Sequence, residues 1–136
     1  MKEVKEYPPN IAFIRQFFPV DDPKYNPLFP WGETLYNPRG IKIPEDVLYH
    51  EEIHRQQQQN DSEGWWQKYC LDKSFRLKEE TEAYHKQWQW VRKHIGAKAG
   101  EEALEEMATN LSSTLYDLQL THNQAKIKIR RYNTFA

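Results

Sequence analysis

The feature that most constrains the fold is a polar segment, residues 44–59, whose side chains can act together only on a helix. Pro44 suits a first helical turn, and Glu45 and Asp46 complement the positive end of a helix dipole. Residues 47–59 contain no glycine or proline and are rich in Glu, Arg and Gln, which favour helix. The sequence therefore predicts a helix over residues 44–59.

The middle of this helix carries His50-Glu51-Glu52-Ile53-His54, an H-E-x-x-H motif. Residues i and i+4 share one face of a helix, so two imidazoles at this spacing can hold one zinc ion at about 2.0–2.1 Å each. Glu51 borders the same face, which suits a carboxylate that takes a proton from water without ligating the metal. The alternative is a solvated helix with two His four residues apart by chance. The shared face favours a site, because it carries His and Gln where apolar residues are expected. The residues on this face are Val47, His50, His54, Gln57 and Gln58.

A third metal ligand must come from another segment, because catalytic zinc usually has three protein ligands. We predict a second helix over residues 75–94, preceded by Ser74 and ended by Gly96. Small Ala83 would let it approach the first helix closely, and Glu80 beside it would then reach the metal. Glu79 and Glu82 are the competing ligands. One stripe of this helix holds Glu80, Ala83, Tyr84, Gln87 and Val91.

The order of these motifs resembles the gluzincin metallopeptidases, and more closely their small bacterial and phage relatives. Those proteins read H-E-x-x-H-x-x-Q, then an aromatic-rich segment, then E-x-E-A-Y. This chain has the first motif over residues 50–57, Trp65-Trp66-x-x-Tyr69 as the aromatic segment, and Glu-Thr-Glu-Ala-Tyr over residues 80–84. The segment from Leu111 to Ala125 also resembles that group's C-terminal pattern. The resemblance covers roughly residues 30–131.

The resemblance implies a zinc metallopeptidase with a minimal zincin-like fold. His50, His54 and Glu80 would be the metal ligands and Glu51 the general base. Tyr84 stands where better-known gluzincins often have Asp, so it would either orient a ligand His or donate to a developing oxyanion. A catalytically inactive binding or structural module, in a phage particle for example, is the alternative function. Hydrolysis of a bond other than a peptide is a third.

For the fold we predict one domain over residues 1–136 in the α+β class, mostly helical, with a small antiparallel hairpin before the metal-binding helix. Residues 1–10 would be a flexible or docked arm, residues 11–18 a strand, and residues 20–30 an irregular loop. The hairpin would pair residues 34–36 with residues 41–43 across an Asn-Pro-Arg-Gly turn. Residues 31–35 would be the edge that binds extended substrate, or simply a cover for the core.

Further helices are predicted around residues 65–70, over residues 101–110, and over residues 122–131 with Thr121 as the cap. The Trp and Tyr residues of the aromatic segment, and Trp88 and Trp90, are interpreted as core. Cys70 is interpreted as a small buried apolar group. Surface or satisfied core positions are expected for the remaining histidines, His85, His94 and His122, and a solvated face for the basic end, Lys126, Lys128, Arg130 and Arg131.

The composition of the chain limits the classes of binding partner that we expect. The net charge of −1 provides no global field that favours nucleic acid or acidic membranes. No apolar run approaches the roughly 18 residues that span a bilayer, and the N-terminus lacks an apolar signal region. The single Cys70 excludes an intrachain disulfide. We therefore expect a peptide or protein substrate, no nucleic-acid or membrane partner, and a cytoplasmic location, or a phage particle or host cytoplasm if the source is viral.

Overall fold

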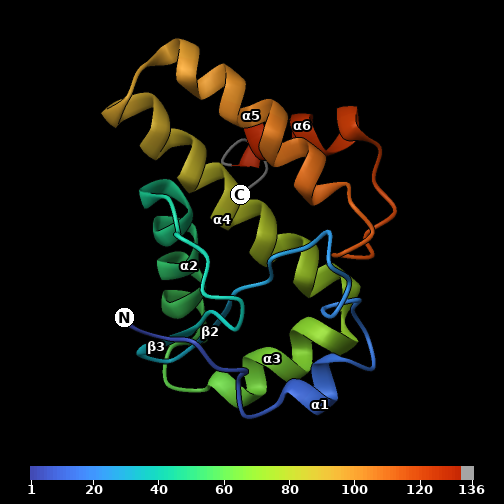
Figure 1. Cartoon of the computed structure of the whole chain (residues 1–136). Helices are drawn as coiled ribbons and strands as arrows, with labels where there is room; N and C mark the ends of the chain where they lie inside the picture. Colours follow the sequence, from blue (N-terminus) through green and yellow to red (C-terminus); the bar gives the residue numbers. More distant parts are fainter. Residues whose placement is uncertain (133–136) are drawn as a thin grey trace.

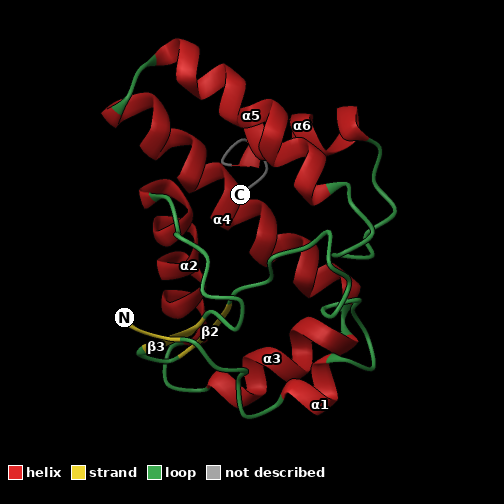
Figure 2. Cartoon of the chain, viewed as in Figure 1, coloured by secondary structure: helices red, strands yellow, loops and turns green. Residues whose placement is uncertain are grey.

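The computed structural model describes residues 1–132 and places a small sheet beside a set of packed helices (Figures 1 and 2). The α+β class is confirmed: the chain is mostly helical, and the sheet precedes the helix that carries the H-E-x-x-H motif. The elements in chain order are β1 (Lys2–Val4), α1 (Ile11–Ile14), β2 (Phe29–Trp31), β3 (Thr34–Tyr36), α2 (Glu45–Gln58), α3 (Ser62–Leu71), α4 (Lys73–His94), α5 (Ala97–Leu111) and α6 (His122–Arg130).

The sheet is mixed, with strand order β1-β3-β2. The predicted pairing of residues 34–36 with residues 41–43 is wrong, because β3 pairs antiparallel with β2 and parallel with β1. With β3 bonded on both sides, residues 41–43 have no strand left to pair with and lead directly into α2. The turn before them does form, since the Asn37 amide bonds both the carbonyl and the N–H of Ile41.

Two other sheet predictions change with this topology. Thr34 and Leu35 lie on the central strand, so the predicted substrate-binding edge at residues 31–35 is wrong for these two residues. The N-terminal arm is docked, because β1 pairs with β3 and the Asn37 N–H donates to the Val4 carbonyl at 2.8 Å.

The predicted strand at residues 11–18 is also wrong, since this segment forms the short helix α1 and following turns. Its two buried side chains, Ile14 and Phe18, are four residues apart, which is a helical rather than a strand spacing. Phe17 lies between them in sequence and is partly exposed. The apolar spacing therefore outweighed the β propensity of the individual residues.

The remaining helices lie where the sequence places them, although α5 begins at Ala97 and not at the predicted residue 101. α2 and α4 match the two predicted helices to within about two residues, α3 carries the aromatic segment, and α5 buries a stripe of Leu104, Met107, Ala108 and Leu111. α6 begins with a capping box, in which Thr121 and Gln124 bond each other's backbone N–H groups. The predicted end of α6 near Arg131 agrees with the observed end at Arg130.

Two apolar clusters hold these elements together. One lies among α4, α5 and α6 and includes Trp88, Leu104 and Ile129; the other joins the N-terminal segment to α3 and includes Ile14 and Trp66. In Figure 1 α4 runs through the centre of the molecule, with α2 on one side and α5 on the other. Across the described residues, no helix has the length and apolar character needed to span a membrane.

Candidate metal centre

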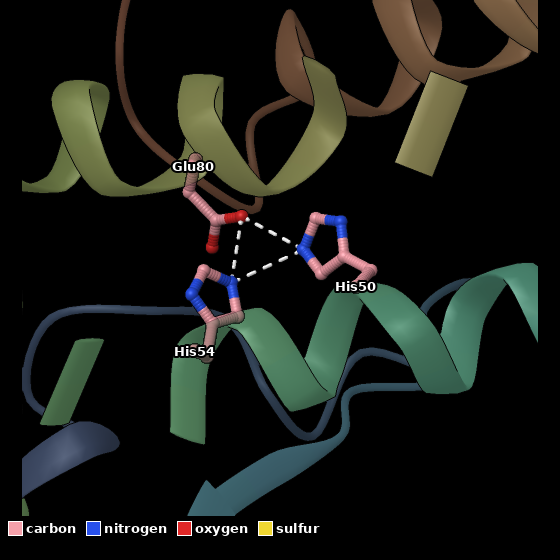
Figure 3. A group of neighbouring side chains, drawn as sticks. All are labelled: His50, His54 and Glu80. Atoms are coloured by element: carbon pink, nitrogen blue, oxygen red, sulfur yellow. Dashed lines mark hydrogen bonds and ion pairs between the residues drawn. The ribbon is translucent and has the colours of Figure 1, made fainter. Parts of the chain in front are cut away.

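The polar faces of α2 and α4 meet inside the molecule. Ala83 of α4 has an exposed fraction of 0%, consistent with the close helix approach that its size allows. His50 and His54 of α2 point toward Glu80 of α4, and the three side chains form a triangle (Figure 3). The structure therefore brings together the three residues that the sequence predicts as metal ligands.

The three facing atoms are equally spaced. Glu80 Oε1 lies 3.1 Å from His50 Nε2 and 3.1 Å from His54 Nε2, and the two Nε2 atoms are 3.1 Å apart. Tetrahedral zinc with bonds of about 2.0–2.1 Å keeps its ligand atoms about 3.3–3.4 Å apart, so the triangle is close to a zinc-binding arrangement. Two imidazoles and a carboxylate are also the donor set of many catalytic zinc sites. The residues present fit a zinc ion.

The competing ligands are engaged elsewhere. Glu79 accepts a hydrogen bond from the indole Nε1 of Trp65 at 3.2 Å. Glu82 accepts from Gln57 at 2.7 Å and from Tyr132 at 3.1 Å. Among the described residues, Glu80 is the carboxylate that joins the two histidines.

Charge coupling in this buried cluster is strong. Burial opposes the charge on Glu80, but His54 and His50 overcome that effect and hold the pKa of its carboxyl well below the usual range. Burial likewise opposes a charge on His54, yet Glu80 raises the pKa of that imidazole to about 9. The second oxygen of Glu80 accepts a hydrogen bond from the Tyr69 hydroxyl at 2.5 Å, which fixes the carboxylate with Oε1 toward the histidines.

Each histidine bonds a glutamine through Nδ1, the ring nitrogen that is not part of the triangle. His50 Nδ1 bonds Gln87 Oε1 at 2.9 Å, and the amide nitrogen of Gln87 donates to Asp46 at 2.8 Å. Because the carboxylate of Asp46 only accepts, the amide oxygen must face the imidazole, and Nδ1 must carry the hydrogen. This tautomer leaves the Nε2 lone pair of His50 directed at the triangle.

The same arrangement repeats at the second histidine. His54 Nδ1 bonds Gln57 Oε1 at 2.7 Å, while the Gln57 amide nitrogen donates to the Glu79 carbonyl at 3.0 Å and to the Glu82 carboxylate at 2.7 Å. Metal-bound histidines usually have such a partner on the other ring nitrogen. The sequence places Gln57 and Gln87 on the facing stripes but does not predict this role for them, although a polar residue within each stripe is the available signal.

Aromatic rings enclose the histidines. Tyr84 packs edge-on against His50 with ring centroids 4.4 Å apart, and Trp65 packs against His54 at 5.2 Å. Gln87 and Gln57 occupy Nδ1 of His50 and His54, and the Tyr84 hydroxyl bonds that of Tyr116 at 2.7 Å. Of the two roles predicted for Tyr84, these contacts favour donation to an oxyanion over orienting a ligand His. Burial, with the charge of Glu80 adding to it, raises the pKa of both tyrosines well above their ordinary value, so both stay protonated at neutral pH.

Glu51 lies beside the triangle without belonging to it. Its side chain is buried, and its Oε2 has no hydrogen-bond partner within residues 1–132. Burial raises the pKa of this carboxyl, although His50 and His54 act in the opposite direction. A buried carboxylate oxygen without a partner is costly, and active sites are where such groups are kept.

A pocket of about 530 Å³ opens onto this cluster and is lined by His50, Glu51, His54 and Glu80. Tyr84 and Tyr116 also line it. Further parts of its wall include residues 24–30, which cross in front of α4 in Figure 1, and the C-terminal part of α5. The volume lies in the range of small-molecule sites.

The other sequence candidates lie away from this centre. Cys70 is buried in the α3 cluster, and burial raises the pKa of its thiol to about 11, so it is a packing residue. His85 is buried and bonds the Ile129 carbonyl at 2.7 Å, while His94 and His122 are surface residues bonded to backbone carbonyls. In the basic end, Lys126 pairs with Glu105 and Arg130 lies 3.9 Å from Glu101.

The chain matches no protein-family model, no curated protein and no solved structure. The resemblance to gluzincins therefore depends on the quoted motifs, and the function has to be argued from the geometry of the site.

Proposed function

We propose that the protein is a zinc-dependent hydrolase that cleaves peptide bonds. The observation that carries the proposal is the buried triangle of His50, His54 and Glu80 with 3.1 Å sides, next to a buried carboxylate oxygen of Glu51 that has no partner in the described chain. Ligands alone would serve a structural metal. A free base and an adjoining pocket are features of a site that does chemistry.

His50, His54 and Glu80 would hold the ion, with Gln87, Gln57 and Tyr69 keeping their ligand atoms in place. When bound, a zinc ion acts as a Lewis acid toward water and toward a carbonyl oxygen.

Glu51 acts as the general base. Its Oε2 takes the proton from the attacking water and then delivers it to the nitrogen of the departing amine. The raised pKa of this carboxyl suits its role as base, since a carboxylate with a higher pKa takes up a proton more readily than an ordinary carboxylate.

Tyr84 and Tyr116 supply a hydrogen-bond donor. In the bond between their hydroxyls one hydrogen is used, so the pair retains one O–H hydrogen to donate. Both residues line the pocket, and the retained hydrogen would stabilise the carbonyl oxygen as it becomes negative in the transition state.

Zinc stoichiometry is the first test. We expect one zinc per chain in the wild type and its loss in the His54→Ala variant. His94→Ala, at an exposed histidine outside the centre, is the matched control and should bind as the wild type does. A wild type that takes up no zinc when supplied with it would reject the proposal.

Hydrolysis is the second test, measured on a peptide library with the zinc-loaded protein. Glu51→Gln should keep zinc and lose about 10²–10⁴-fold in rate. The control is Glu52→Gln, because Glu52 pairs with Arg55 instead of facing the cluster. Zinc binding without hydrolysis of any peptide would favour an inactive binding module or another substrate class.

A further inference from the structure

One side chain closes the sheet edge that lies next to the metal helix. Gln58, the last residue of α2, donates from Nε2 to the Pro30 carbonyl at 2.7 Å and accepts at Oε1 from the Gly32 N–H at 2.9 Å. These two backbone groups flank Trp31 of β2. A neighbouring parallel strand would use one residue's N–H and C=O to bond such a pair. The Gln58 carboxamide therefore occupies the position that an added strand would take.

The closure is reinforced by its surroundings. Trp66 Nε1 also donates to the Pro30 carbonyl at 2.9 Å, and the Ser62 hydroxyl donates to Gln58 Oε1 at 2.8 Å. Pro30 itself has no N–H to offer. Since Gln58 is buried, an incoming chain would have to displace it and leave buried polar groups without partners.

The chain before β2 is similarly engaged. The Arg39 guanidinium donates to the carbonyls of Asp22, Pro23 and Tyr25, and the Tyr25 hydroxyl bonds Thr114 at 2.5 Å. β1 forms the far edge of the sheet, and none of the described residues that line the pocket belongs to it. Neither edge presents a free strand to the metal centre.

We propose that the site binds short peptides through side-chain contacts in the pocket, and that it does not bind extended polypeptide by strand addition. This inference deepens the proposed function and rests on it. In strand addition the main-chain hydrogen bonds supply affinity. Without them, affinity must come from burial of substrate side chains against the pocket walls.

The pocket walls indicate which side chain is bound. Leu28, Ile41 and Val47 are half-buried, line the pocket and come from three different segments: the loop before β2, the loop after β3, and the first turn of α2. Val47 is four residues before Glu51 on α2, so the part of the apolar wall that Val47 forms lies one helical turn from the candidate base. An apolar residue beside the cleaved bond fits this wall.

The closing experiment measures peptide binding to the zinc-loaded Glu51→Gln variant. Peptides with a central Leu should bind at least about 10-fold more tightly than the same peptides with a central Asp. Lengthening the Leu peptide from roughly four to roughly ten residues should change affinity by less than about threefold, because no strand pairs. Affinity that climbs with each added pair of residues, no preference for Leu, or no binding would overturn the inference.

Variants in the wall give an independent check. Leu28→Asn and Ile41→Asn should each lower the Leu-over-Asp preference while zinc stoichiometry is unchanged. Ile95→Asn makes the same change at a position 65% exposed, just beyond α4, and should leave the preference intact. An equal Leu-over-Asp preference in all three variants would show that Leu28 and Ile41 do not form the wall that binds the substrate side chain.

The two proposals fail in different ways. Selective binding of short apolar peptides, with no hydrolysis by the zinc-loaded wild type, would support this mode of recognition and reject the peptidase. Hydrolysis that is indifferent to the side chain and increases with substrate length would support the peptidase and reject this recognition mode.

Discussion

α2 and α5 are neighbours of α4 on opposite sides, and they are buried by different means (Figure 1). α5 buries Leu104, Met107, Ala108 and Leu111, an ordinary apolar stripe. α2 buries His50, Glu51, His54 and Gln58, with Ile53 as its buried apolar residue. One helix is held by apolar packing, and the other by hydrogen bonds and charge.

The difference shows where this chain gives up stability for a site. Burying polar groups is costly unless each is bonded, and nearly every polar side chain on the buried face of α2 has a named partner on α4, on β2 or on α2 itself. Glu51 Oε2 is the exception. Such a face contributes little net hydrophobic stabilisation, so most of the stabilisation must come from the two apolar clusters, one among α4, α5 and α6 and the other around α3.

Leu104→Ala should have the largest effect on stability, and it tests whether the apolar side can be weakened without affecting the metal centre. Leu104 has an exposed fraction of 0%, so the truncation leaves a cavity and should lower the free energy of unfolding by about 2–5 kcal/mol. Zinc stoichiometry of the folded variant should remain that of the wild type. Denaturant unfolding without zinc, followed by metal analysis, measures both. A folded variant without zinc would mean that the two regions are not separable.

Gln87→Leu tests the hydrogen-bonded side. Removing the amide frees His50 to rotate and change tautomer, so zinc affinity should fall about 10–100-fold. Gln89→Leu on the exposed face of α4 is the matched control and should bind zinc as the wild type does. Competition with a chelator measures the affinity. Unchanged affinity in Gln87→Leu would show that the glutamine does not position the ligand.

Zinc binding should also depend on pH. With Glu80 raising the pKa of His54 to about 9, the metal-free imidazole carries a proton at neutral pH, and zinc must displace it. The affinity should therefore rise about tenfold per pH unit from pH 7 toward pH 9, and level off above that. Chelator competition across this range, corrected for protonation of the chelator, is the measurement. A flat profile would contradict the coupling of His54 to Glu80.

Thr121→Ala should have the smallest effect. It removes the cap of α6, whose Oγ1 accepts from the Gln124 N–H at 3.1 Å, and should cost about 1 kcal/mol of stability. Because α6 packs on the apolar side, zinc affinity should not change. Thermal unfolding with and without zinc separates the two quantities, and a change in zinc affinity would link α6 to the metal centre.

Local patterns predicted most of the helices because their causes are local. The absence of breakers in residues 47–59, the apolar period of α5 and the Thr121 cap all act within a few residues. The strand predicted at residues 11–18 failed where the β propensity of single residues was weighed above the four-residue spacing of Ile14 and Phe18. The hairpin failed because strand partners are chosen by distant segments, here β1 and β2.

The sequence by itself determined that His50 and His54 share one helical face with Glu51 beside them, because a spacing of four residues closes about one turn whatever the rest of the chain does. It left Glu79, Glu80 and Glu82 open as the third ligand. Only the packing of α4 on α2 decided for Glu80 as the residue that joins the triangle, and assigned Gln87, Tyr69 and Gln58 their contacts. Those contacts join residues from 11 to 37 positions apart, and such distances are set by how helices pack, which no local pattern records.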